Sequence, residues 1–147
     1  MHATTKHIIL YADDDQDDQQ LIKQAFQKYN NNVSVETASN GVEALTYLKN
    51  LSAYQLQPCL VILDINMPKM DGKETLMKIR QTEKLKDIPV VLFSTSAGGK
   101  DKEFARKWDA DFISKPVTYS ELISIADEFI KHCEFDVNQS IAFKKVS

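Results

Sequence analysis

Several polar side chains stand directly after apolar stretches of this chain. The carboxylates, hydroxyls and lysine placed in this way are Asp13, Asp14, Asp64, Ser94, Thr95 and Lys115. A carboxylate, a hydroxyl donor and a compact positive charge are the parts of a phosphoryl-transfer site. In such a site Asp64 would be the nucleophile, and an aspartyl phosphate would be the product.

Three of these residues also suit a metal ion. Asp13, Asp14 and Asp64 would repel one another if they were crowded together, and a divalent cation removes that conflict. Ligands that are all oxygen, with no histidine or cysteine, select a hard ion. The sequence therefore predicts a site for Mg²⁺, or Mn²⁺ in its place.

The apolar patterns predict the elements that position these side chains. Strands are expected at residues 6–12, 33–38, 60–64, 90–93 and 111–114, the second of them half-exposed like an edge strand. Helices are expected at residues 15–29, 40–51, 70–83, 100–107 and 120–130. Val42 is expected among the buried residues of the second helix, and Ser120 is expected to cap the last one.

Strands that alternate with helices predict an α/β fold with a doubly wound, five-stranded parallel sheet. The favoured strand order is 2-1-3-4-5, with helices on both faces, as in flavodoxin-like folds. In that order, the four strands that end in reactive residues are neighbours. Their carboxyl ends would meet at one pocket, at the switch point between the first and third strands.

Composition limits the classes of function. The chain has 147 residues, is 43% hydrophobic and carries a formal net charge of −3, which predicts one globular domain without general attraction to nucleic acid. Two cysteines without ligand spacing fit a reducing, cytoplasmic setting, and no apolar run approaches the roughly 20 residues that span a bilayer. We expect a domain at residues 1–132, a tail of unknown structure at 133–147, and no membrane partner.

Five motifs follow one another in the chain. They are Asp13-Asp14, residues 40–45, residues 64–72, Ser94-Thr95 and Lys115-Pro116. Together they resemble the receiver domain of bacterial two-component response regulators, over about residues 6–130. The resemblance implies that Asp64 accepts a phosphoryl group from a phosphohistidine on a histidine kinase or phosphotransfer protein. It implies a signalling domain rather than an enzyme. Such a domain catalyses only its own phosphoryl transfer and autodephosphorylation.

The resemblance also implies roles for the matched residues. Metal ligands would be Asp14, Asp64 and the backbone carbonyl of Asn66, with Asp13 acting mainly through a metal-bound water. Ser94 and Lys115 would bind phosphoryl oxygens, helped by backbone N–H groups near Asn66 and Thr95. Exchanging Asn66 or Ser96, the neighbours of the phosphoryl group, would change how long the phosphate lasts.

The family's switch couples the loop at Ser94 to an aromatic residue three positions before the lysine, which is Phe112 here. The bond between Lys115 and Pro116 is commonly cis in the family. The resemblance is to stand-alone receivers, acting as a monomer or weak homodimer. An unidentified protein partner would bind the face formed by the fourth helix, the fifth strand and the last helix.

Other interpretations remain for these residues. Taken singly, the acidic run would be a solvated helix start, Asp64 a turn residue and Lys115 a surface lysine. A receiver-like adaptor that acts without phosphorylation is the alternative function. An aspartyl phosphatase is disfavoured, because Asn66 stands where those enzymes carry their second aspartate.

Overall fold

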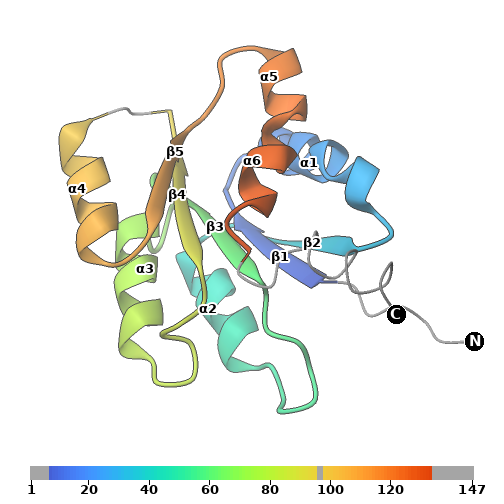
Figure 1. The fold of residues 1–147 in the computed structure, drawn as a ribbon. Helices are drawn as coiled ribbons and strands as arrows, with labels where there is room; N and C mark the ends of the chain where they lie inside the picture. The colour runs from blue at the N-terminus through green and yellow to red at the C-terminus, as the bar shows by residue number, and fades with distance from the viewer. Residues whose placement is uncertain (1–6, 96–97, 134–147) are drawn as a thin grey trace, which may run out of the picture.

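A five-stranded parallel sheet forms the centre of the molecule (Figure 1). The computed structural model describes residues 7–95 and 98–133, so Ser96 and the tail from residue 134 lie outside the described residues. The strands are β1 (His7–Ala12), β2 (Val33–Ala38), β3 (Leu60–Asp64), β4 (Val90–Ser94) and β5 (Asp111–Ser114). Their order is β2-β1-β3-β4-β5, which confirms the predicted topology.

Helices cover both faces of the sheet (Figure 1). They are α1 (Gln16–Ala25), α2 (Gly41–Lys49), α3 (Gly72–Gln81), α4 (Gly99–Lys107), α5 (Tyr119–Ile123) and α6 (Ile125–Ile130), and a 3₁₀ turn η1 (Gln27–Tyr29) follows α1. On one face Leu48, Leu76 and Ala105 bring α2, α3 and α4 into a shared apolar core. On the other face Ile22 of α1 and Phe129 of α6 pack into a second core.

The central strands β3 and β4 are continuous apolar runs because both of their faces are buried. All five residues of β3 and all five of β4 are buried, whereas β2 at the sheet edge is only partly buried. Burial on both faces leaves the strand ends as the places for polar chemistry. The register aligns those ends, since Asp64 lies beside Phe93 and Ser94 lies beside Ser114.

Two local predictions are wrong. Val42 is 42% exposed, because the buried face of α2 runs through Gly41, Ala44, Leu45 and Leu48 and turns Val42 outward. The last helical region begins with Thr118, not Ser120, as its cap, and Thr118 Oγ1 accepts from the Glu121 N–H at 3.2 Å. It divides at Ser124, whose hydroxyl donates to the Glu121 carbonyl at 3.0 Å.

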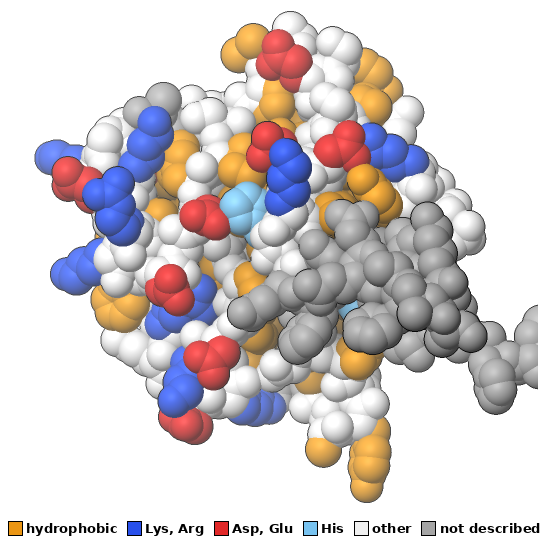
Figure 2. Space-filling view, in the orientation of Figure 1, with side chains coloured by type: hydrophobic (Ala, Val, Ile, Leu, Met, Phe, Trp, Pro, Cys, Tyr) orange, Lys and Arg blue, Asp and Glu red, His pale blue; other side chains and the backbone are white. Residues whose placement is uncertain are grey.

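Charged side chains of both signs are interspersed over the face shown in Figure 2, without a continuous patch of one sign over α3 and α4. Within residues 7–95 and 98–133, no helix has both the length and the apolar character needed to cross a membrane.

Candidate functional site

Asp13 lies at the end of β1 and is completely buried. Its backbone N–H donates to the Ala38 carbonyl at 2.9 Å, which extends the β1–β2 pairing by one residue. Its Oδ1 accepts from the Asp15 N–H at 3.0 Å, and its Oδ2 accepts from the Tyr11 hydroxyl. A buried carboxylate is costly without partners, and these donors hold it in one orientation.

Three carboxylates converge at the carboxyl ends of β1 and β3. One oxygen from each of Asp13, Asp14 and Asp64 lies within 4.8 Å of the other two. Asp64 is 8% exposed and Asp14 is exposed, so the cluster opens to solvent through Asp14. An all-oxygen set with an open side fits a hard divalent cation that keeps some of its waters. The structure thus brings together the three side chains that the sequence singles out as metal ligands.

Lys115, which follows β5, points its ammonium into this cluster. Lys115 Nζ lies 2.8 Å from Asp13 Oδ2, 3.0 Å from Asp18 Oδ2 and 3.6 Å from Asp64 Oδ2. Its side chain is only 11% exposed. A lysine held by three carboxylates and largely removed from water is not a surface lysine. The alternative interpretation of Lys115, taken singly, as a surface lysine is therefore wrong.

The pKa values follow from this crowding. Burial raises the pKa of Asp64, and the charge of Asp13 raises it further, whereas the charge of Lys115 lowers it. The net result is a pKa of about 6, raised from 3.8. Burial by itself would lower the pKa of Lys115, but the hydrogen bond and charge of Asp13 outweigh it and raise that pKa. Burial, then Asp13, raise the pKa of Tyr11 far above its ordinary value. Tyr11 therefore stays a protonated donor.

The remaining predicted residues occupy several positions relative to the carboxyl ends of the strands. Ser94 is buried at the end of β4, and Thr95 after it is exposed. Asn66 is exposed, and its backbone forms a hydrogen bond with Asp64. Phe112 is half-buried in β5 and packs against the core. Ser96 lies outside the described residues.

The expectation of a cis bond before Pro116 is wrong. Residues 7–95 and 98–133 contain no cis peptide bond, so Lys115 and Pro116 are joined in trans. Lys115 is aimed instead by the end of the sheet, because its N–H donates to the Ser94 carbonyl at 2.8 Å and continues the β4–β5 pairing.

Two residues of the site were missed in the sequence. Asp18 lies in the first turn of α1, where a negative charge suits the helix start, yet its carboxylate also binds Lys115. Tyr11 was counted as part of an apolar strand, yet its hydroxyl binds Asp13. The available signal for Tyr11 was its spacing, because residues two apart in a strand point to the same face. Asp18 offered no comparable signal, since its orientation depends on how α1 crosses the sheet.

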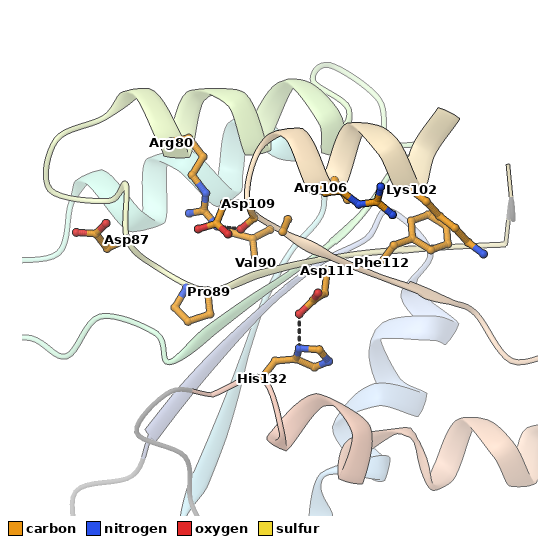
Figure 3. A pocket seen from close by; sticks show the side chains of 12 residues that line it. Arg80, Asp87, Pro89, Val90, Lys102, Arg106, Asp109, Asp111, Phe112 and His132 are labelled. Atoms are coloured by element: carbon orange, nitrogen blue, oxygen red, sulfur yellow. Dashed lines mark hydrogen bonds and ion pairs between the residues drawn. The ribbon is translucent and has the colours of Figure 1, made fainter. Parts of the chain in front are cut away.

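A cavity of about 500 Å³ lies at the amino ends of the strands, where β4 and β5 begin (Figure 3). Arg80 in its wall donates to the carbonyls of Trp108 at 2.9 Å and Ile88 at 2.7 Å. Asp111 in the same wall pairs with His132 at 2.7 Å. These charged groups are engaged in joining α3, α4 and α6 to the sheet, so the candidate chemistry belongs to the Asp64 cluster.

The raised pKa of Asp64 predicts a pH-dependent gain in stability for Asp64→Asn without metal. Because the pKa of Asp64 is higher in the folded protein than in the unfolded chain, ionising Asp64 costs folding free energy. The cost is absent below its ordinary pKa of 3.8 and is complete once the pH has risen through about 6. We expect Asp64→Asn to stabilise the protein by up to about 3 kcal/mol at about pH 8, and by almost nothing at about pH 4. Urea unfolding at both pH values measures the difference.

The control is Asp127→Asn. Hydrogen bonds from Lys28 and Tyr29 lower the pKa of Asp127, so this substitution should reduce stability at neutral pH. An equal gain for Asp64→Asn at both pH values would contradict the electrostatic explanation.

Comparison with known proteins places this arrangement in a family. The sequence model of the response regulator receiver domain matches residues 9–127. The probable methanogenesis regulatory protein FilR2 of Methanothrix harundinacea is 31% identical over 130 residues, which are 87% of this chain and 84% of that protein. The chain therefore belongs to the response regulator receiver family, whose members are signalling domains of two-component systems phosphorylated by histidine kinases.

Solved structures agree with this assignment. The phosphorylated cyanobacterial phytochrome response regulator RcpA superposes with a TM-score of 0.79 at 31% identity, covering 88% of this chain and 94% of RcpA. The Mn²⁺-bound form of response regulator Rcp1 superposes with a TM-score of 0.74 at 26% identity, covering 83% of this chain and 90% of Rcp1. A divalent metal in that relative agrees with the acidic cluster described above.

Proposed function

We propose that Asp64 is the phosphoacceptor of this receiver and that Mg²⁺, or Mn²⁺, supports the transfer. The observation that carries the proposal is the convergence of three carboxylates within 4.8 Å, with the Lys115 ammonium 3.6 Å from Asp64. Asp14, Asp64 and the Asn66 carbonyl would hold the cation, and Asp13 would act through a water. When bound, the cation neutralises charge that develops on the phosphoryl oxygens.

The transfer itself is an in-line displacement. An Asp64 carboxylate oxygen forms a bond to phosphorus as the bond from phosphorus to the donor's histidine nitrogen breaks. The electron pair of that bond leaves with the imidazole. Lys115 then exchanges a carboxylate partner for a phosphoryl oxygen, and the Ser94 hydroxyl donates to another. In autodephosphorylation, water attacks the same phosphorus as the bond from phosphorus to the Asp64 oxygen breaks. The Asp64 carboxylate is restored, and inorganic phosphate, which keeps the protons of the water, leaves the site.

Rearrangement of Lys115 and Ser94 around the phosphoryl group would alter the surface that binds a downstream protein. Ser94 and Lys115 are joined through the backbone at 2.8 Å, and Phe112 lies in the adjoining strand β5. Movement of the Ser94 loop would therefore be passed to Phe112 and to the surface of α4, β5 and the last helical region, α5 and α6. That surface is the proposed contact for a downstream protein, and a histidine kinase or phosphotransfer protein is the proposed donor.

Intact-mass spectrometry after incubation with a small acyl phosphate tests the proposal. We expect one phosphoryl group to be added in the presence of Mg²⁺, none with a chelator, and none to Asp64→Asn. Asp127→Asn, which changes an exposed carboxylate on α6, should be modified as fully as the parent protein. Addition to Asp64→Asn at the parent level would exclude Asp64 as the acceptor. A parent protein that accepts no phosphoryl group and binds no beryllofluoride would favour the adaptor.

A further inference from the structure

The Tyr11 hydroxyl is buried against the acidic cluster, where it binds Asp13. Tyr11 has no exposed surface, and its ring packs edge-on against Phe93 with 6.3 Å between ring centroids. It lies two residues before Asp13 in the same strand and points to the same face, where its hydroxyl donates to Asp13 Oδ2. The fixed ring keeps the hydroxyl on that oxygen.

The hydrogen bonds of Asp13 leave it little capacity for a metal. A carboxylate has about four lone-pair positions for hydrogen bonds or metals. On Asp13, Oδ2 accepts from Tyr11 and from Lys115 at 2.8 Å, and Oδ1 accepts from the Asp15 N–H at 3.0 Å. One position on Oδ1 remains, which suits a single hydrogen bond from a metal-bound water.

Distance does not keep Asp13 from the cation. Two ligands on opposite sides of one Ca²⁺, each about 2.4 Å away, are about 4.8 Å apart. The oxygens of Asp13, Asp14 and Asp64 already lie within that separation. The donors on Asp13, and not its position, therefore decide whether it becomes a third direct ligand.

We propose that Tyr11 determines which cation the site selects. By holding Asp13 Oδ2, it limits the direct carboxylate ligands to Asp14 and Asp64, and thereby favours Mg²⁺ over Ca²⁺. Mg²⁺ keeps several waters and binds through one or two carboxylates, whereas Ca²⁺ takes six to eight oxygens and accommodates further carboxylates. This inference rests on the metal site of the proposed function and adds the residue that sets its selectivity.

Calorimetric titration of Tyr11→Phe with Mg²⁺ and with Ca²⁺ tests the inference. Phenylalanine keeps the ring and frees one position on a buried carboxylate oxygen, which a larger cation can use. We expect the ratio of Ca²⁺ to Mg²⁺ affinity to rise roughly fivefold or more. The matched control is Tyr29→Phe, which also removes a tyrosine–aspartate hydrogen bond, to Asp127 at 2.6 Å, but far from the cluster. It should leave the ratio unchanged.

Asp13→Asn supplies a second, independent variant. In the parent protein Asp13 is not a direct ligand, so Asp13→Asn should weaken both cations alike and keep their ratio within about twofold. Combined with Tyr11→Phe, it should cancel the gain in Ca²⁺ affinity. A selective loss of Ca²⁺ in Asp13→Asn alone would show direct ligation and overturn the inference, as would an unchanged ratio in folded Tyr11→Phe.

These titrations separate the inference from the proposed function, because they use the unphosphorylated protein. A parent protein that accepts no phosphoryl group, but whose selectivity shifts in Tyr11→Phe, would refute the function and keep the inference. Normal phosphorylation with an unchanged ratio would refute the inference alone. Failure of the parent protein to bind either cation would refute the inference.

Discussion

Replacing Gly72 with alanine is expected to destabilise the folded protein by at least about 3 kcal/mol and to abolish most phosphoryl acceptance. The cause is a close approach of backbone to backbone rather than an unusual dihedral angle. A Cβ at position 72 would lie 2.3 Å from the Asp64 carbonyl oxygen and 2.9 Å from the Ile65 Cα. No side chain can move aside to relieve these contacts.

The close approach has a structural purpose. The Gly72 N–H donates to the Ile65 carbonyl at 2.9 Å, which ties the start of α3 to the segment that carries Asp64. Pushing the two segments apart breaks this bond and displaces Asp64 from Asp13, Asp14 and Lys115. A shift of about 1 Å in a reacting group reduces rates on the order of 10²-fold.

Gly99→Ala is the matched control. Gly99 begins α4, and a Cβ there would meet no atom within 4 Å. Alanine at that position should leave phosphoryl acceptance intact and leave stability unchanged or slightly raised. Urea unfolding and intact-mass measurement of both variants provide the comparison. Equal stabilities for the two variants would refute the steric argument at Gly72.

The sheet was predictable chiefly because its central strands β3 and β4 are buried on both faces. The run that ends at Asp64 has a single interpretation once its length and the following turn are considered, and the same holds for β4. The convergence of Asp13, Asp14, Asp64 and Lys115 then follows from strand order alone, since parallel strands end at one edge.

The partners of those side chains could not be predicted in the same way. Apolar patterning treats Tyr11 as one more buried residue, although its hydroxyl decides how Asp13 is satisfied. The role of Asp18 depends on the angle at which α1 crosses the sheet. Val42 was misplaced because an apolar residue near a helix start can face either way, and the close contact of Gly41 with Met70 determines the rotation of α2.

Replacing Lys115 with methionine is expected to affect the two activities of the site in opposite directions. Methionine keeps an unbranched side chain and removes the charge. Without the Lys115 ammonium to bind a phosphoryl oxygen, transfer from an acyl phosphate should slow by about 100-fold. Affinity for Mg²⁺ should rise by about tenfold, because the ammonium that now lies 2.8 Å from Asp13 and 3.6 Å from Asp64 no longer repels it.

The opposite signs distinguish loss of this charge from general damage to the site. Lys28→Met is the matched control, because Lys28 also pairs with an aspartate, Asp127, at 2.8 Å, but on the exposed surface between η1 and α6. It should change neither rate nor affinity. Calorimetry gives the affinity, and the time course of intact mass at saturating Mg²⁺ gives the rate. If Lys115→Met weakened both together, the lysine would be holding the carboxylates in place, and its proposed role at the phosphoryl oxygens would be wrong.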